Sequence, residues 1–495
     1  MSAARPSLDS VTTINADGSR NFLHPADTRG RWTLARRVVA WFLIAVYVLL
    51  PWIPVGAHPA VFLDVAGRRF HLLGWTLSLQ ETWLLFFALT GAGFALFFIT
   101  ALLGRVWCGW ACPQTVFLEH VYRRIEVLLE GDAPARRRLD AAPWDAAKTA
   151  RRVAKHALYF LVSALVAHVL LAYFVSLPRL YAMITTAPTA HWGTFLFVFV
   201  TSGLLYFNFA WFREQLCIVV CPYGRLQSAL IDDHSLVVGY DAKRGEPRRQ
   251  GRAGAPPPSA IGSGRAVPSE ATAAVAKEGD CVDCLRCVHV CPTGIDIRQG
   301  LQMECLACTA CIDACDDVMT RLRRPTGLIR YDSLAGFAGG RTKWVRPRTM
   351  LYAALLVVGA AVALLAFASV KPTAFDAMRM PGGAYFLDTD AVRNQMLVRL
   401  TNKTDAVRRV ALSVEGAPAG LLLSGTDDTI ELAPLAESLH TVVLRMPKPR
   451  FAGKFRYRIV ARDLDGGYEL VKPAEFLGPD PKLLQEDYWR EKSPR

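Results

Sequence analysis

Residues 280–318 read DCVDCLRCVHVCPTGIDIRQGLQMECLACTACIDACDDV and carry eight of the chain's twelve cysteines. The eight form two runs with one spacing, C-x2-C-x2-C-x3-C. The first run consists of Cys281, Cys284, Cys287 and Cys291, and the second of Cys305, Cys308, Cys311 and Cys315. Two-residue gaps let three thiolates of one loop surround a metal cluster, and this spacing is typical of paired 4Fe–4S clusters. The stretch therefore predicts a domain that carries single electrons.

The fourth cysteine of each such run ligates the cluster of the other run. We therefore expect the first cluster to bind Cys281, Cys284, Cys287 and Cys315. We expect the second cluster to bind Cys305, Cys308, Cys311 and Cys291. Zinc is the alternative occupant, but zinc sites usually use two separated C-x2-C pairs. Asp316 follows Cys315 where Pro292 follows Cys291, and together with Asp313 and Asp317 it predicts negative charge and a low reduction potential at this end.

The other four cysteines form two C-x3-C-P motifs, each ending before a proline, and they are Cys108, Cys112, Cys217 and Cys221. Thiols at positions i and i+4 lie on one face of a helix, and the proline predicts a break or bend after it. Four such thiols could hold Cu(I) or an iron–sulfur centre, cycle between dithiol and disulfide, or pack as small apolar residues. Arg105 and Arg213 precede the motifs and predict either thiolate stabilisation or anchoring at the membrane.

Five long stretches without charge predict transmembrane helices, because each supplies the ~20 apolar residues that a bilayer requires. They run between Arg37 and Asp64, Thr82 and Gly104, His156 and Pro178, Leu180 and Phe212, and Thr349 and Val370. The first 37 residues are polar, so we interpret the first stretch as an uncleaved anchor and not as a signal peptide. The chain is thus predicted to be a multi-pass protein in contact with membrane lipid.

The net charge of +14 predicts the topology. Basic residues gather in segment 113–155, whereas the loop after the first stretch has only Arg68 and Arg69. By the positive-inside rule, the N-terminus and segments 105–155 and 213–348 are cytoplasmic, and the region from Lys371 is periplasmic in a bacterial inner membrane. All cysteines then lie on the cytoplasmic side, opposite to the distribution expected for a disulfide scaffold. No nucleic-acid-binding module accompanies the positive charge.

The membrane part is duplicated in sequence. Cys108 and Cys217 are 109 residues apart, as are Cys112 and Cys221, and each pair follows two apolar stretches. Such a repeat predicts two facing cysteine motifs in a pseudo-symmetric unit. Beyond the last apolar stretch, short alternating segments such as Leu397–Thr401 and Phe455–Val460 predict a β-sandwich of immunoglobulin type.

The predicted organisation therefore has six parts. They are a cytoplasmic N-terminal segment (1–37), a duplicated four-helix membrane unit (38–235), a linker rich in Gly, Pro, Ala and Arg (236–278), a ferredoxin-type domain with two 4Fe–4S clusters (279–328), a fifth transmembrane helix (349–370) and a periplasmic Ig-like β-sandwich domain (371–495). The fold class is a multi-domain membrane protein with an α-helical bundle. The ferredoxin-type part is too small for a large core, so its clusters would organise it.

This combination resembles the CcoG/FixG family of bacterial cytochrome c oxidase assembly proteins, also called Rdx proteins. The matching segments are Arg105–Val116 (RVWCGWACPQTV), Cys217–Gln227 (CIVVCPYGRLQ), Tyr240–Pro247 (YDAKRGEP), Asp280–Val318 and the β domain. The resemblance implies a cupric reductase, converting Cu(II) to Cu(I) on the cytoplasmic side, in assembly of the C-family haem–copper oxidase. It also implies a copper-exporting P-type ATPase and oxidase assembly factors as partners.

We hypothesise that electrons enter through the two clusters and leave to copper held near the C-x3-C-P thiols. Copper passed between soft thiolate sites must be Cu(I), which fits this order. No glycine-rich nucleotide fingerprint occurs, so the electron donor is external. Two other functions remain open: a quinol-linked electron-transfer subunit that feeds a periplasmic reductase, and a non-enzymatic assembly scaffold with structural clusters.

Overall fold

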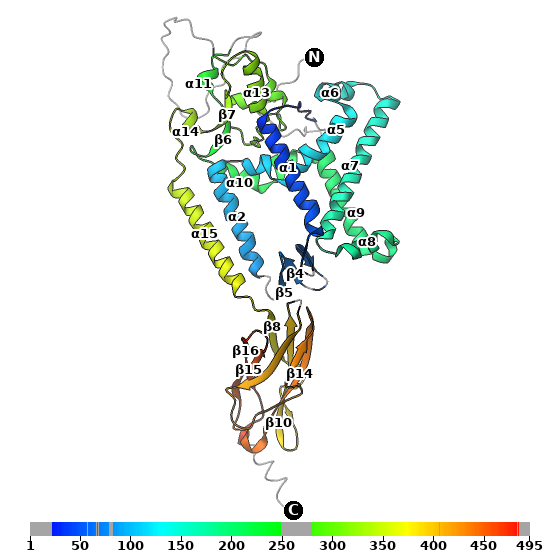
Figure 1. Cartoon of the computed structure of the whole chain (residues 1–495), viewed down its shortest axis with the longest axis vertical. Helices are drawn as coiled ribbons and strands as arrows, with labels where there is room; N and C mark the ends of the chain where they lie inside the picture. Colours follow the sequence, from blue (N-terminus) through cyan, green and yellow to red (C-terminus); the bar gives the residue numbers. More distant parts are fainter. Residues whose placement is uncertain are drawn as a thin grey trace, which may run out of the picture. The chain divides into compact units, whose positions relative to one another are not determined.

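The computed structural model describes residues 22–56, 58–65, 67, 69–78, 83–248, 279–404, 406–482 and 484. The chain divides into two compact units (Figure 1). One consists of Met1–Ile53 and Leu85–Ala363, and it holds all twelve cysteines. The other consists of Pro54–Leu84 and Leu364–Arg495.

Five helices among the described residues are long and apolar enough to cross a membrane, which confirms the prediction. They are α1 (Arg31–Leu49), α2 (Trp83–Leu103), α7 (Ala146–Ala172), α9 (Trp192–Phe207) and α15 (Pro347–Ala368). Large apolar side chains lie exposed along them, as Leu89 does with 77% of its surface, and only lipid makes such exposure favourable. The first helix ends earlier than predicted, because prolines 51 and 54 interrupt it.

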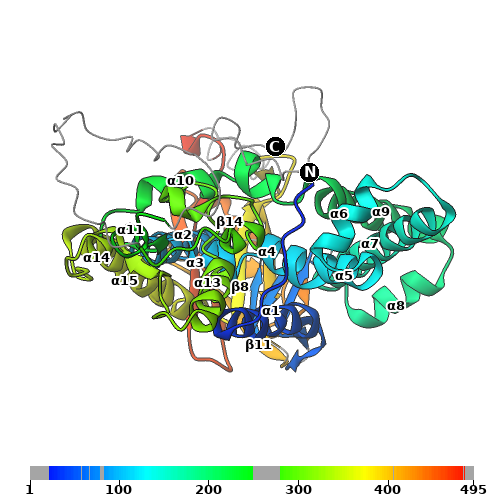
Figure 2. The same cartoon turned by 90° about the horizontal axis from the view of Figure 1, so that it is seen from above.

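Shorter helices and turns complete the membrane part. The first repeat adds α3 (Val106–Trp110), α4 (Pro113–Phe117), η3 (Leu118–Tyr122), α5 (Arg123–Glu130) and α6 (Ala133–Ala141). The second repeat adds α8 (Leu177–Thr185), η4 (Pro188–His191), η5 (Asn208–Phe212), η6 (Leu216–Val220) and α10 (Pro222–Leu230). Figure 2 shows α5 to α9 gathered on one side of this unit.

The two repeats have the same backbone geometry around their cysteines. Gly104 and Arg213, which are 109 residues apart, both have positive φ angles of 58° and 53°. The amide of Cys112 donates to the carbonyl of Trp107 at 2.8 Å, and the amide of Cys221 donates to that of Leu216 at the same distance. These five-residue turns are the π-type winding that often marks functional sites.

The ferredoxin-type domain includes a small sheet that the sequence analysis missed. Strand β6 (Leu236–Tyr240) pairs antiparallel with β7 (Ile329–Ser333), and α11 (Ala242–Gly245) follows β6. The expected linker 236–278 is therefore wrong for residues 236–248; residues 249–278 lie outside the described part. The strand forms because Val237 and Val238 are β-branched and bury against the domain core. The other elements are α12 (Arg286–His289), η7 (Ile297–Gln299), α13 (Ala310–Arg321) and α14 (Leu334–Phe337).

The first membrane helix is bound directly to the ferredoxin-type domain. The N-cap residue of α1 is Gly30, which has no side chain to cap the helix. Asp313 of α13 caps it instead, because its carboxylate accepts hydrogen bonds from the backbone amide and the hydroxyl of Thr33, both at 2.6 Å. Arg36 donates to the carbonyl of Cys308 at 2.8 Å. Figures 1 and 2 show α13 beside the N-terminal end of α1. The expected N-terminal segment 1–37 therefore contributes to the cluster domain.

The described residues of the second unit form mainly β-strands. Residues 54–78, expected to be the end of a span and a loop, form β1 (Pro54–Val55), β2 (His58–Pro59), β3 (Val61–Asp64), β4 (Arg69–Leu72) and β5 (Trp75–Ser78), the last three as an antiparallel meander. The remaining strands are β8 (Thr373–Arg379), β9 (Phe386–Leu387), β10 (Ala391–Asn402), β11 (Arg408–Glu415), β12 (Leu422–Ser424), β13 (Ile430–Leu432), β14 (Glu437–Pro447), β15 (Phe455–Asp463) and β16 (Glu469–Phe476), with η8 (Lys448–Arg450).

Two antiparallel sheets form the predicted sandwich. One has the order β12-β14-β10-β8 with β9 on β10, and the other β13-β11-β15-β16. Along β10 every second side chain is buried, including Val398 and Leu400, which are fully enclosed. The alternation places one face of each sheet in a shared core, so the Ig-like prediction is confirmed.

Candidate functional site

A cavity in the ferredoxin-type domain is lined by one predicted set of thiols. We call it the Cys284 cavity, and its cysteines are Cys281, Cys284, Cys287 and Cys315. A second cavity, the Cys308 cavity, is lined by the other predicted set, Cys291, Cys305, Cys308 and Cys311, and Cys287 also reaches it. Each encloses about 350 Å³ between the atoms, part of it open to solvent. The fourth cysteine of each run thus lies at the cavity of the other run.

The backbone of both loops curls around its cavity in the same way. Asp283 and Leu285 flank Cys284 with φ angles of 50° and 59°, and Ala307 and Thr309 flank Cys308 with 52° and 64°. Left-handed φ angles are costly for such residues, by ~1–2 kcal/mol each, so the loop shape needs external support. Among the described residues no three Cys, His, Asp or Glu side chains meet closely enough for a single ion. The donors are all thiols spread around a cavity, which fits a cluster better than zinc.

Of the three aspartates near the second run, Asp317 is paired with cations while Asp313 and Asp316 have neutral hydrogen-bond donors, so the low reduction potential stays a prediction. Asp313 caps α1, and Asp316 accepts from the amide of Gly327 at 2.8 Å. Asp317 pairs with Arg286 at 2.8 Å and with Arg321 at 3.0 Å. Most of these partners are distant in sequence from the aspartates, so the spacing of the cysteines could not reveal them.

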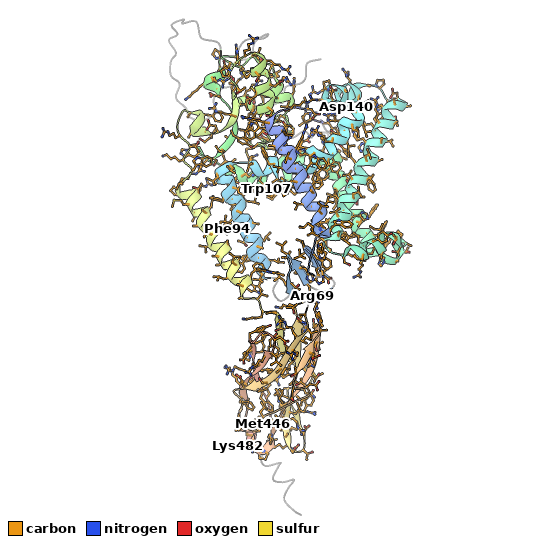
Figure 3. All side chains as sticks on the ribbon, in the orientation of Figure 1. Arg69, Phe94, Trp107, Asp140, Met446 and Lys482 are labelled. Carbon is orange, nitrogen blue, oxygen red and sulfur yellow. The ribbon has the colours of Figure 1, made fainter. Side chains whose placement is uncertain are left out.

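The C-x3-C-P thiols come together from the two repeats. Burial raises the pKa of Cys217, and the charges of Cys112, Cys108 and Cys221 raise it further, so the four lie within electrostatic reach of one another. We call them the thiol quartet. Reciprocal hydrogen bonds join the repeats: Gln114 donates to the carbonyl of Arg213 at 2.9 Å, and Thr100 bonds Tyr223. Figure 3 labels Trp107, directly before Cys108, at the end of α2.

The two thiols of a motif do not share one continuous helix, contrary to expectation. Helix α3 ends at Trp110, and Cys112 is extended (φ −62°, ψ 125°) as the N-cap of α4, with Pro113 at its first position. Cys221 is likewise the extended N-cap of α10. Proline suits the first helical position because its missing N–H needs no partner there. The motif therefore places its second thiol at a helix N-terminus.

Burial raises the pKa of the thiols of Cys108, Cys112 and Cys217, which favours their protonated form when no metal is bound. It raises the pKa of Cys108 to about 12, although Arg105 opposes the shift. Burial also raises the pKa of Cys112, while backbone N–H groups of Thr115 and Gln114 at the α4 N-terminus act against it. A soft metal would displace the protons, because a coordinating thiol is deprotonated.

Arg105 and Arg213 have different roles, and their positions in the repeats are not equivalent. Arg105 donates to the carbonyls of Cys305 at 3.3 Å and Gly224 at 3.1 Å. Arg213 forms a buried ion pair with Glu126. Burial alone would raise the pKa of Glu126, but Arg213 and other arginines hold it well below its usual value. Arg213 is thus engaged by a carboxylate, and only Arg105 faces a thiol.

The thiol quartet adjoins the Cys308 cavity. Cys108 and Cys217 pack against a buried cluster that includes Leu306, Cys308 and Ala310. Cys284, in contrast, is exposed at the other cavity. The order in space is therefore exposed cavity, buried cavity, thiol quartet. The sequence analysis missed Gly109, which touches the Leu306 loop; its only signal was a glycine between the cysteines of one motif.

Three segments match known protein families. Residues 212–334 match a family described as a 4Fe-4S dicluster domain, and residues 84–131 match a 4Fe-4S binding domain. Residues 363–479 match the IG-like fold at the C-terminal of FixG. The second match is notable because Cys108 and Cys112 are the cysteines within it. The matches support bound iron–sulfur clusters.

Curated relatives align over most of the chain. The nitrogen fixation protein FixG of Rhizobium meliloti is 33% identical over 93% of each chain. Protein RdxA of Cereibacter sphaeroides is 38% identical over 78% of this chain and 81% of its own, and RdxB of the same organism is 32% identical over 86% and 89%. A crystal structure of a FixG-related protein from Vibrio parahaemolyticus covers 22% of this chain and 97% of its own, with 17% identity and a TM-score of 0.20.

These matches, the five apolar helices and the cluster domain describe a membrane iron–sulfur oxidoreductase that transfers electrons. The chain belongs to the FixG/Rdx family.

Proposed function

We propose that this protein is a cupric reductase, which passes single electrons from an external donor to Cu(II) and yields Cu(I). The observation that carries the proposal is the packing of Cys108 and Cys217 against the loop of the Cys308 cavity. A soft thiolate site for copper then lies beside an electron carrier. The proposal goes beyond the family assignment, which specifies electron transfer but no acceptor.

In this proposal, one 4Fe–4S cluster is held by Cys281, Cys284, Cys287 and Cys315. The other is held by Cys291, Cys305, Cys308 and Cys311. Bound clusters of this type supply reversible one-electron oxidation and reduction. Exposed Cys284 makes the first cavity the side that an external electron donor would approach.

Copper is the substrate at the thiol quartet. Cu(II) accepts one electron and becomes Cu(I). Cu(I) prefers soft thiolates over harder ligands. Burial raises the pKa of the Cys108 thiol, so copper would displace a proton from this thiol on binding. One electron reduces one ion, and no other group is transferred.

The cellular setting is also proposed. Arginines and lysines of segment 113–155 favour a cytoplasmic location for the quartet and the cluster domain in a bacterial inner membrane, with the β-sandwich periplasmic. Cu(I) would pass to a copper-exporting P-type ATPase, and oxidase assembly factors would be further partners in building the C-family haem–copper oxidase.

The decisive experiment replaces Cys108 and Cys217 by serine in the full-length protein, purified without oxygen. We expect both clusters to remain by EPR, with about eight irons per chain, while Cu(II) reduction, followed with a Cu(I)-specific chelator, is lost. Reduction at the wild-type rate would refute the quartet as the copper site. An iron count of about twelve in the wild-type protein would instead assign a third cluster to the quartet.

Two further measurements separate the alternative functions. Reduction of the clusters by a quinol analogue in the purified protein would favour a quinol-linked subunit. Oxidase assembly that survives replacement of Cys284 and Cys308 would favour a scaffold with structural clusters.

A further inference from the structure

We infer that Gly109 is a positioning residue for electron transfer between the Cys308 cavity and the thiol quartet. Its missing side chain lets the C-x3-C turn of the first repeat rest directly on the loop of that cavity. The inference rests on the proposed function, since it concerns the same electron path, but it assigns a role to a residue that is neither a cluster ligand nor a copper ligand.

The space around Gly109 explains why glycine stands there. A Cβ atom would lie 2.5 Å from the carbonyl oxygen of Leu306 and 2.8 Å from that of Ala307, both far inside contact distance. Gly109 is buried within helix α3, and its φ angle is not positive. In a helix glycine is less favourable than alanine by ~1 kcal/mol. Backbone conformation therefore does not require glycine, whereas the close approach does.

The loop on the other side of this contact is held firmly. Side chains from three other elements donate to its carbonyls: Arg105 to Cys305 at 3.3 Å, Tyr331 to Ala307 at 2.8 Å, and Arg36 to Cys308 at 2.8 Å. The left-handed backbone conformation of Ala307, with a φ angle of 52°, further restricts this loop.

Aromatic contacts surround Trp110, the neighbour of Gly109. The ring of Trp32 packs edge to face against Trp110, with 6.1 Å between the ring centroids, and against Tyr331, with 5.4 Å between them. A loop fixed from several sides cannot yield to a new side chain. A larger residue at position 109 must therefore move the C-x3-C turn, with Cys108, away from the Cys308 cavity.

The step affected is the transfer of one electron from a reduced 4Fe–4S cluster at the Cys308 cavity to one Cu(II) at the quartet, which leaves an oxidised cluster and Cu(I). An external one-electron donor restores the cluster. The rate of electron transfer falls steeply with the distance between donor and acceptor, so moving the C-x3-C turn away from the Cys308 cavity slows this step.

The test compares Gly109→Ala and Gly109→Val with Gly93→Ala, a matched control in α2 where an added Cβ meets nothing within 4 Å. The full-length proteins are reduced with dithionite, freed of excess, and mixed with Cu(II) in a stopped-flow instrument. At saturating Cu(II), we expect cluster reoxidation to slow several-fold in Gly109→Val and less in Gly109→Ala. Reoxidation by ferricyanide, which can react at exposed Cys284, should stay at the wild-type rate.

A second readout does not depend on activity. Hydrogen exchange of the peptide covering residues 106–112 should accelerate in Gly109→Val and stay unchanged in Gly93→Ala, with both cluster EPR signals retained. Should Gly109→Val not assemble its clusters, Gly109→Ala, which adds the smallest volume, carries the test, and we expect slower reoxidation than in Gly93→Ala.

The outcomes are distinguishable. If Cu(II) does not reoxidise the wild-type protein, the proposed function fails and this inference falls with it. If Cu(II) reoxidises wild type and the variants equally fast, only the positioning role of Gly109 is overturned.

Discussion

Asp313 joins the ferredoxin-type domain to the first membrane helix, and its replacement by alanine measures the strength of that joint. The carboxylate is 4% exposed. One oxygen accepts from the amide and the hydroxyl of Thr33, each at 2.6 Å, and the other accepts from the amide of Trp32 at 3.3 Å. It therefore caps α1 from another domain and also interacts with the positive end of the helix dipole.

The magnitude follows from these contacts. A hydrogen bond to a charged group contributes ~1.5–3 kcal/mol, and truncation of an N-cap residue to alanine costs ~0.5–2 kcal/mol. The contacts share one carboxylate, so they do not add fully. We expect Asp313→Ala to destabilise the joint by about 3 kcal/mol, which raises its opening equilibrium by about 100-fold.

Hydrogen exchange of the amides of Trp32 and Thr33 in detergent-solubilised protein measures this opening. Thr33→Val keeps the carboxylate and the amide bonds and loses the hydroxyl bonds to Asp313 and Thr28, so it should cost about 1–2 kcal/mol. The iron content of each variant checks that the clusters remain, because Asp313 lies close to Cys311 and Cys315. Exchange in Asp313→Ala within about twofold of wild type, with full iron content, would refute the capping role.

Three further predictions concern stability. Glu126→Gln leaves Arg213 and Arg136 without their buried partner, so thermal unfolding should show a loss of ~3–5 kcal/mol. Burial lowers the pKa of His120 to about 4, so on acidification the unfolded chain binds a proton at this histidine before the folded chain does. The free energy of unfolding should therefore be constant above pH ~6.5 and lower by ~2 kcal/mol at pH 5. In denaturant titrations, His120→Asn should flatten this pH dependence. Anaerobic iron removal should abolish hydrogen-exchange protection over residues 279–328 and leave the β-sandwich protected, because only the sandwich has a large apolar core.

Controls exist for each of these. Glu415→Gln breaks an exposed ion pair with Arg458 and should cost less than ~1 kcal/mol; an equal loss in both glutamate variants would contradict the buried-pair argument. A pH dependence that survives in His120→Asn would assign it to other groups. Protection of residues 279–328 without iron would show that the domain folds without its clusters.

Patterns confined to short segments were sufficient for much of the fold. Hydropathy located the five apolar helices, since spanning a bilayer requires about 20 consecutive apolar residues. Alternation located strands such as β10 and β15, because every second side chain of a half-buried strand faces the core. The cysteine sets at the two cavities likewise agree with spacing alone.

Predictions failed where the sequence pattern of a segment was short or weak, and where partners distant in sequence determined what a residue contacts. Residues 54–78 and 236–248 contain short strands. Their length and composition resembled those of the end of a membrane span in the first case and of a linker in the second. Arg105 and Arg213 looked equivalent beside their motifs, yet one contacts the cluster loop and the other a buried glutamate. The second thiol of each C-x3-C-P motif begins a new helix, since proline after it favours the first helical position over continuation.

By itself, the sequence predicted which cysteines belong together, because ligands of one loop must be spaced to surround one cluster. Only the tertiary structure decided that the thiol quartet adjoins the Cys308 cavity and not the Cys284 cavity. That choice depends on contacts between residues about 200 positions apart, such as Arg105 with Cys305 and Gly109 with Leu306. Such contacts leave no periodic signal in either segment; they follow from how the folded elements pack.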